Sequence, residues 1–270
     1  MFHSSAVSHW RYLYFCCAIC VVCFLITWAW KLTSEQGNTS ISIVFSDKPR
    51  VSELIFSQTR PRDCSEVLKH GNKLSGVYTI WPRSNITQNK PLQVYCDMNV
   101  AGEGWTVIQR RGDYPQPQRF DIQWDKYKTG FGDITKDFWL GNDNIYALSN
   151  QGPCEIRFDL EDTKGNRRFA IYKKFWIDDE ASFYTLHIGD YSGNAGNGMR
   201  FYNGRPFVTE DQDHHQMAQI LNGAWWMFEW PFCHLNGIYI PGVHDHRSMH
   251  WYEWHKNKGL ATTEIKIKLK

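Results

Sequence analysis

The eight residues at positions 104–111, GWTVIQRR, decide the fold of this chain. Aromatic and β-branched side chains dominate the middle of the stretch, and such residues favour β-strands. Gly104 opens the stretch and Gly112 follows it directly, and glycine marks turns. The pattern therefore predicts a strand over residues 105–109 that is bounded by turns.

Four further runs of the same kind follow or precede it, separated by turn signals rich in glycine and asparagine. They lie at residues 92–96, 154–160, 169–176 and 264–269. The strands alternate with irregular segments, and no unit of sequence repeats. We therefore predict one domain of the α+β class.

The composition excludes two classes of protein. Thirty basic residues against 28 acidic ones leave a formal charge of +2, which is too small for a face that neutralises nucleic-acid phosphates. Aromatic residues make up 16% of the chain, far more than a disordered sequence carries. We therefore expect a folded protein with no nucleic-acid partner.

The cysteines fall into two groups. Four of them crowd into an apolar run near the amino terminus, namely Cys16, Cys17, Cys20 and Cys23. The other four are spread along the chain and indicate an oxidising compartment, namely Cys64, Cys96, Cys154 and Cys233. The apolar neighbours of the first group suit lipid better than a thiolate metal cluster, and palmitoylation near the interface is an alternative.

An uncharged segment, residues 12–30, lies between Arg11 and Lys31. Its length is enough to cross a bilayer as a helix, and aromatic residues at both ends match interfacial belts. We therefore predict a signal anchor, with a cleaved signal peptide as the alternative. Residues 1–11 would then be a cytoplasmic segment and residues 31–61 a polar stalk.

Either interpretation places the bulk of the chain outside the cytosol. An uncleaved anchor makes a single-pass type II membrane protein, whereas removal of residues 1–29 releases a secreted one. Asn38 and Asn85 begin triplets that fit N-glycosylation on that side of the membrane. The stalk is too short for a sustained coiled coil, so the oligomeric state stays open.

Residues 189–254 carry few signals for secondary structure and are rich in glycine, asparagine, aspartate and aromatic residues. Seven of the eleven histidines lie between His214 and His255. A long segment without elements of its own is usually functional or disordered, and the aromatic content favours function. We therefore expect the functional site in this region.

Several motifs carry a resemblance to a known family. They are VYCDM at 94–98, GWTVIQRR at 104–111, FWLGN at 138–142, EIRFDL at 155–160, YSGNAG at 191–196, NGRPF at 203–207, GAWW at 223–226 and LNG at 235–237. In this order they closely resemble the fibrinogen-like C-terminal domain over residues 62–270, and ficolins and tachylectin-like lectins in particular.

The resemblance implies a single globular domain with a twisted, mainly antiparallel sheet and a loop-rich distal region that binds ligands. It implies an extracellular recognition module of the lectin type for carbohydrates or acetylated ligands, acting in pattern recognition or innate defence. A bound Ca²⁺ ion near the ligand and the absence of catalysis are further implications.

The chain departs from the family at the loop that holds Ca²⁺ in its relatives. The resemblance places Asp211 and Asp213 at two acidic positions, but the third is His215 and the loop is shorter. Because Ca²⁺ needs an oxygen-rich loop, a solvated turn is the alternative interpretation. Zinc is a further alternative, since His214, His215, His244 and His246 are present, although without the spacing of a known zinc motif.

The resemblance also implies a disulfide between Cys64 and Cys96. The second disulfide of the family is missing, because both of its cysteine positions carry other residues here. We predict a replacement bridge between Cys154 and Cys233, since unpaired thiols are a liability in an oxidising compartment.

The ligand pocket implied by the resemblance is partly changed, with Met227 in place of a tyrosine and Pro231 in place of a histidine. Aromatic faces bind the apolar face of a sugar or an acetyl methyl group. The predicted ligand-binding residues are Trp225, Trp226, Met227, Trp230, Pro231, Tyr239, Trp251 and Trp254. The alternative is that Trp225, Trp226 and Trp251 belong to the core.

One motif that is present and two that are absent bear on other functions. Arg111-Gly112-Asp113 is an RGD tripeptide, but a hairpin turn after the strand explains it without an integrin partner. No Gly-X-Ser-X-Gly or His-Glu-X-X-His motif is present, so we expect no enzymatic activity. The main alternative function is a protein ligand or adhesion factor, like angiopoietin-type or tenascin-type relatives, that binds a cell-surface receptor.

Overall fold

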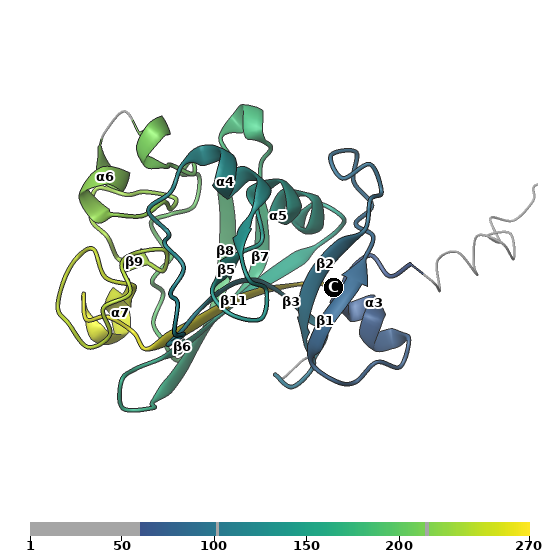
Figure 1. Cartoon of the computed structure of the whole chain (residues 1–270), viewed down its shortest axis with the longest axis horizontal. Coiled ribbons are helices and arrows are strands. Elements are labelled where there is room, and N and C mark those ends of the chain that lie inside the picture. Colours follow the sequence, from purple (N-terminus) through teal and green to yellow (C-terminus); the bar gives the residue numbers. More distant parts are fainter. Residues whose placement is uncertain (1–59, 101–102, 214–215) are drawn as a thin grey trace, which may run out of the picture. The chain divides into compact units, whose positions relative to one another are not determined.

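The computed structural model describes residues 60–100, 103–213 and 216–270 (Figure 1). The helices in these ranges are α3 (Cys64–Lys69), α4 (Trp124–Thr129), α5 (Asn142–Ser149), α6 (Met217–Leu221) and α7 (Tyr252–His255), with 3₁₀ turns η1 (Glu180–Ser182) and η2 (Glu210–Gln212). The strands are β1 (Gly76–Ile80), β2 (Leu92–Asp97), β3 (Trp105–Arg111), β4 (Phe131–Gly132), β5 (Phe138–Trp139), β6 (Cys154–Glu161), β7 (Arg167–Ile177), β8 (Leu186–Gly193), β9 (Cys233–His234), β10 (His250–Trp251) and β11 (Thr262–Leu269).

The main sheet is antiparallel and has the order β1-β2-β3-β11-β6-β7-β8, with β4 and β5 beside β3. The C-terminal strand β11 lies in the middle, between β3 and β6. All five strands predicted from the sequence are present as β2, β3, β6, β7 and β11, and each extends slightly beyond its predicted range. The predicted α+β domain with a mainly antiparallel sheet is confirmed.

The two faces of this sheet differ in chemistry. The difference is clearest along β6, where buried and half-buried residues alternate and successive side chains point to opposite faces. Ile156, Phe158 and Leu160 point into the core, which also contains buried side chains of α4 and α5. Arg157 and Asp159 point to the opposite face, where charged residues of β3 and β11 join them. The core therefore lies on one side of the sheet and a polar groove on the other.

The first described helix, α3, is fastened to the sheet in two ways. The carboxylate of Asp63 caps the helix by accepting the N–H of Glu66 at 2.8 Å. The Cys64–Cys96 disulfide then joins α3 to β2, with 5.4 Å between the Cα atoms. This disulfide is the one predicted from the resemblance.

The predicted bridge between Cys154 and Cys233 is wrong, because the structure holds both residues as buried free thiols. Cys154 opens β6 opposite Leu269, whereas Cys233 lies in β9, where its N–H donates to the hydroxyl of Tyr202 at 2.8 Å. Burial raises the pKa of Cys154 to about 12 and raises the pKa of Cys233 well above its usual value. Both thiols therefore stay protonated and unreactive.

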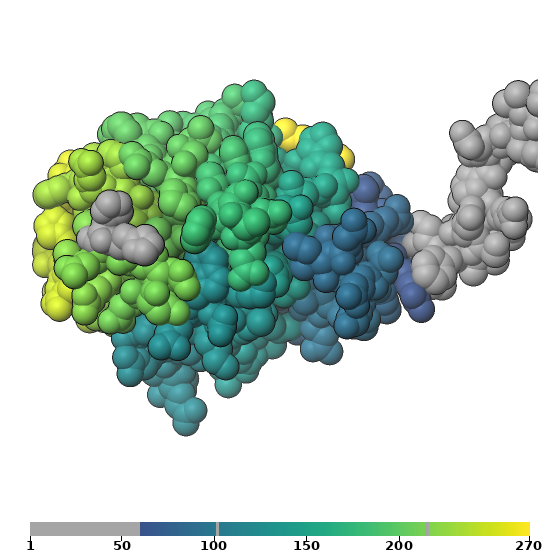
Figure 2. Space-filling view, turned by 90° about the horizontal axis from the view of Figure 1, so that it is seen from above, coloured from purple at the N-terminus to yellow at the C-terminus, as the bar shows by residue number. Residues whose placement is uncertain are grey.

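The region between β8 and β11 contains only short elements, as predicted for residues 189–254. Figure 2 shows this region, coloured green to yellow, at one end of the domain, and residues 60–100, coloured blue, at the other. Within the described ranges no helix is long and apolar enough to cross a bilayer. The predicted segments 1–11 and 12–30, residues 31–59 of the predicted stalk 31–61, and Asn38 lie outside these ranges.

Candidate ligand-binding surface

Three of the predicted ligand-binding tryptophans are core residues. Trp225, Trp226 and Trp251 are at most 1% exposed. Trp225 and Trp226 pack against each other and against Trp139, and Trp251 packs on Phe158 of β6. They cannot touch a ligand on the surface, so the prediction is wrong for these three and the core interpretation holds.

The other predicted residues lie nearer the surface, but they do not form one wall. Trp230 is 47% exposed, whereas Met227, Tyr239 and Trp254 are half-buried. Tyr239 donates its hydroxyl to the carbonyl of Ala261 at 3.1 Å, and Trp254 lies under the guanidinium of Arg168. Of the predicted set, Trp230 is therefore the aromatic side chain most open to a ligand.

Pro231 is buried and serves to position Trp230. Its carbonyl oxygen lies 2.7 Å from Nε2 of His250, and Nδ1 of the same ring lies 2.8 Å from the carbonyl of Ser248. Burial lowers the pKa of His250, while both carbonyl contacts favour its charged form. This imidazole therefore ties the Trp230-Pro231 segment to the start of β10.

Four partly exposed rings pack on one another, and we group them with Trp230, which lies between two of them in the sequence, as the distal aromatic surface. Its members are Phe201, Phe228, Trp230, Phe232 and Tyr252. Phe201 stacks on Phe228 with centroids 5.5 Å apart and also contacts Phe232 at 4.8 Å. Phe232 meets Tyr252 edge-on at 5.6 Å, and Trp230 meets the ring of His246 at 5.2 Å. These contacts hold the rings in fixed orientations.

Cationic side chains lie over several of these rings. The guanidinium of Arg200 is 4.6 Å from the ring centre of Phe201 and also forms an ion pair with Glu253. The guanidinium of Arg205 is 4.9 Å from Phe228, and the amine of Lys256 is 4.8 Å from Tyr252. Rings flanked by hydrogen-bond donors can bind an apolar patch and orient its polar neighbours.

Three rings of this surface were not predicted from the sequence, namely Phe201, Phe228 and Phe232. A usable signal was the aromatic density of residues 225–232, in which five of eight positions carry a ring. Sequence does not show which of those rings face the core. Only the packing separates buried Trp225 and Trp226 from the exposed rings that follow.

Asp211, one of the predicted calcium ligands, is already engaged within the protein. Both of its carboxylate oxygens accept the N–H of Trp124, at 3.0 and 3.3 Å, at the start of α4. The hydroxyl of Thr209 donates to it at 2.7 Å. Asp211 therefore caps a helix that is remote in sequence.

Asp213 also accepts a backbone hydrogen bond, from the N–H of Ala218 in α6 at 2.5 Å. His215 lies outside the described residues, and so does His214. Within the described ranges no group of three or more His, Cys, Asp and Glu side chains could hold a metal ion. Because residues 214 and 215 lie outside the described ranges, Ca²⁺ binding through Asp211, Asp213 and His215, with zinc as the alternative, stays a prediction.

The capping role of Asp211 gives a measurable expectation. Asp211→Ala should lower the free energy of unfolding by about 1 kcal/mol, the usual loss for a helix cap. The loss should be the same in excess Ca²⁺ and in EGTA, as measured by urea denaturation of the full chain. If Ca²⁺ raised the free energy of unfolding of the wild-type chain but not that of the Asp211→Ala variant, Asp211 would instead be a metal ligand.

The RGD tripeptide does not present its arginine to a partner. Arg111 is 2% exposed, and its guanidinium donates to the carbonyls of Leu235 and Gly237 and stacks on Phe120. Burial lowers the pKa of Arg111 to about 10. The predicted hairpin is also absent, because the N–H of Gly112 donates to Asp137 and the chain continues to α4.

The antiparallel sheet, with a loop-rich distal end that carries exposed rings, defines a fibrinogen-like globular domain. Residues 60–270 match the family described as “Fibrinogen beta and gamma chains, C-terminal globular domain”. The chain therefore belongs to the fibrinogen C-terminal domain family. Lectins are among its relatives, together with tenascin-type and angiopoietin-like proteins.

Three relatives illustrate this range. The chain is 46% identical to Techylectin-5A of Tachypleus tridentatus over 217 residues, which cover 78% of this chain and 74% of that protein. It is 40% identical to tenascin-R of Mus musculus over 245 residues, but this covers 89% of the chain and only 17% of that much longer protein. The solved fibrinogen-like globe domain of human ANGPTL2 aligns with a TM-score of 0.73 at 35% identity, over 77% of this chain and 99% of that domain.

Proposed function

We propose that this protein is a non-enzymatic, extracellular recognition module whose distal aromatic surface binds carbohydrate or acetylated ligands. The observation that carries the proposal is the cluster of partly exposed rings packed around Phe201 and flanked by Arg200 and Arg205. The 46% identity to Techylectin-5A supports the lectin type. Pattern recognition in innate defence is the role that this type of binding serves.

The proposed mechanism divides the binding between two kinds of group. The exposed parts of the Trp230 and Phe201 rings, which are 47% and 40% exposed, contact the apolar face of a sugar ring or an acetyl methyl group. The cationic groups beside the rings donate to hydroxyl or carbonyl oxygens and fix the orientation. A single site of this size binds weakly, so clustering of several chains would increase the avidity.

Replacement of Trp230 by alanine should weaken ligand binding at least tenfold, because exposed aromatic anchors dominate small interfaces. The fold should persist, since half of this side chain is already in water. Binding of the full chain to immobilised N-acetylglucosamine and N-acetylgalactosamine, and to the non-acetylated sugars, measures the effect. The matched control is Trp176→Ala, which removes a tryptophan that is 39% exposed on β7 and outside the distal aromatic surface.

Two results would contradict the proposal. Equal binding by the wild-type chain and the Trp230→Ala variant would show that the ligand binds outside the distal aromatic surface. Absence of binding to every sugar by the folded wild-type chain would remove the lectin function. Repeating the assay with a chelator tests the calcium prediction separately. Binding that is unchanged by the chelator would show that the ligand site does not need Ca²⁺.

The alternative is a protein ligand or adhesion factor that binds a cell-surface receptor through the same surface. It is favoured by the combination of exposed aromatic residues and arginine, which is enriched at the centres of protein interfaces. The relation to tenascin-R and to the ANGPTL2 domain supports this alternative. A receptor partner predicts binding that free acetylated sugar does not displace.

We propose an extracellular location for the domain, held by the predicted signal anchor or secreted after its cleavage. The Cys64–Cys96 disulfide supports an oxidising compartment. The exposed Asn85 lies in a turn in which the hydroxyl of Thr87 donates to the carbonyls of Pro82 and Ser84. An exposed turn of this kind is accessible to N-glycosylation, and a mass shift upon enzymatic removal of glycans tests it.

A further inference from the structure

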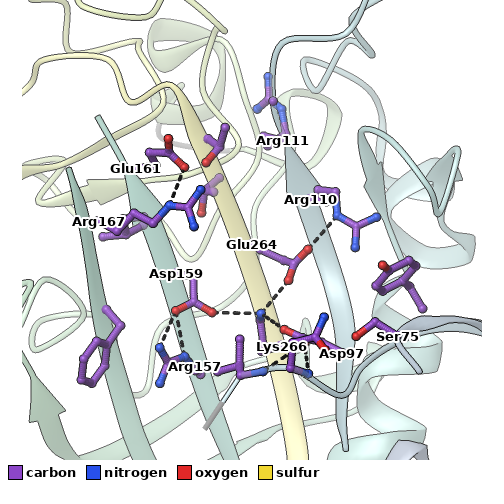
Figure 3. Close-up of a pocket in the computed structure, with 18 of the residues that line it drawn as sticks. Ser75, Asp97, Arg110, Arg111, Arg157, Asp159, Glu161, Arg167, Glu264 and Lys266 are labelled. Atoms are coloured by element: carbon purple, nitrogen blue, oxygen red, sulfur yellow. Dashed lines mark hydrogen bonds and ion pairs between the residues drawn. The ribbon is translucent and has the colours of Figure 1, made fainter. Parts of the chain in front are cut away.

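A cavity of about 890 Å³ opens on the sheet face opposite the core and is separate from the distal aromatic surface. Side chains of β2, β3, β11, β6 and β7 line it, so it crosses the middle of the sheet (Figure 3). Its volume lies within the range of ligand-binding pockets. We call it the sheet groove.

Lys266 of β11 forms the floor of the sheet groove. Its side chain is only 2% exposed, and its ammonium group lies 2.5, 2.6 and 2.9 Å from carboxylate oxygens of Asp97, Glu264 and Asp159. Burial alone would lower the pKa of Lys266, but the three carboxylates raise it overall. The floor is therefore a fixed charged network rather than a flexible surface.

Arginine side chains form the walls and are each held by one of the carboxylates. Arg110 donates Nε to Glu264 and lies 4.2 Å above the ring of Tyr95. Arg157 donates Nε to Asp159 at 2.8 Å and lies 4.4 Å above the ring of Phe169. Figure 3 shows these pairs on either side of Lys266. The guanidinium planes are therefore set before any ligand arrives.

The middle of the sheet groove offers donors to a ligand, because the carboxylates around Lys266 are already engaged. Lys266 and the wall arginines occupy carboxylate oxygens of Asp97, Asp159 and Glu264. Arg167, at the rim, is 80% exposed and uses only Nε in its contact with Glu161. A ligand with oxygen acceptors, such as hydroxyl, ring or acetamido oxygens, can bind these donors.

The charges of the sheet groove are balanced. Arg111 borders it but directs its guanidinium to Leu235 and Gly237. The remaining charged side chains are five cations, Arg110, Arg157, Arg167, Arg168 and Lys266, and five carboxylates, Asp97, Asp113, Asp159, Glu161 and Glu264. A polyanion would gain no net attraction here, because counterion release needs an excess of cations.

We propose that the sheet groove is a second binding site, for a neutral oligosaccharide. Such a ligand is uncharged, rich in oxygen acceptors and able to lay an apolar ring face on an aromatic side chain. Tyr114 supplies that face, since it lines the groove half-buried. The inference rests on the proposed carbohydrate-binding function and adds a site that would extend the ligand contact beyond one sugar ring.

The test uses the full chain and a neutral tetrasaccharide of N-acetylglucosamine that carries a photoreactive diazirine. After illumination, mass spectrometry maps the labelled peptides. We expect label both near the groove, on peptides with Tyr114 or residues 157–168, and near the distal aromatic surface. The double variant Tyr114→Ala/Arg167→Ala should lose at least tenfold of the groove label and keep the distal label, whereas Trp230→Ala should do the reverse. Lys174→Ala, an exposed β7 lysine outside the groove, is the matched control.

The outcomes separate the two proposals. Label confined to the distal peptides overturns the sheet groove site and leaves the proposed function intact. Absence of label from both regions overturns both. A third result would be groove labelling by a sulfated tetrasaccharide and not by the neutral one. If that labelling were lost when salt is raised from 50 to 200 mM, as expected of ionic contacts, the ligand would be anionic and the proposal of a neutral ligand would be overturned. Neutral groove label that persists at high salt supports the proposal.

Discussion

Replacement of Lys266 by methionine should lower the free energy of unfolding by about 3 kcal/mol. Methionine keeps most of the volume of the side chain but leaves Asp97, Asp159 and Glu264 without their shared cation. Removing one partner of a buried ion pair usually costs about 3–5 kcal/mol, and the lower end applies because Asp159 and Glu264 are partly exposed. Urea denaturation of the purified chain measures the loss.

This loss should depend on pH. Burial would raise the pKa of Asp97, but the charge and hydrogen bond of Lys266 lower it overall below 3.8. A lowered carboxylate pKa contributes stability above the unfolded value, and the contribution is lost as pH falls through the folded value. The raised pKa of Lys266 contributes stability below 10.5 that is lost as pH rises through the folded value. The difference between wild type and variant should therefore be largest from about pH 5 to pH 10.

The control is Lys268→Met on the same strand. Lys268 pairs with Glu155 at 3.6 Å and is 19% exposed, so its loss should cost less than about 1 kcal/mol. If Lys266→Met proved as stable as this control, the carboxylates would not depend on Lys266. If its deficit persisted unchanged at pH 3, packing rather than charge would be the cause.

Removal of the Cys64–Cys96 disulfide by alanine substitution at both positions should lower the free energy of unfolding by about 4 kcal/mol. The bridge closes a loop with a sequence separation of 32 residues, and constraining such a loop in the unfolded chain contributes about that amount. The cost should fall on α3 and β2 first, because the bridge joins them. Denaturant unfolding under non-reducing conditions measures it.

Reductant separates this disulfide from the two buried thiols. Dithiothreitol should destabilise the wild-type chain as much as the double substitution does and should not affect the double variant further. The matched pair Cys154→Ala/Cys233→Ala should keep the full response to reductant, because both residues are free thiols. Loss of that response in this second variant would restore a bridge between Cys154 and Cys233.

The strands are the part of the fold that the sequence predicts best. The predicted ranges 105–109 and 154–160 reappear as β3 and β6 because local propensity and glycine turns act within a few residues. The segment between β8 and β11 was expected to lack long elements for the same local reason, and it does. Trp230 was predicted as a ligand-binding residue and is exposed, but the reason for its exposure was not visible in the sequence, and its role stays a prediction.

Contacts between distant residues decided the rest. Trp225 and Trp230 lie five positions apart, yet one is buried against Trp139 and the other is half in water. Asp211 caps a helix that begins 87 residues earlier, and Arg111 bonds to a carbonyl 126 residues later. The sheet groove exists only because β11 pairs with both β3 and β6. The sequence by itself determined the strands, since these depend on local patterns, and its ordered motifs showed the family, whose resemblance implied the Cys64–Cys96 pair. Which rings meet solvent, which thiols stay free and where charges converge were decided by tertiary packing, because burial is a property of the whole chain.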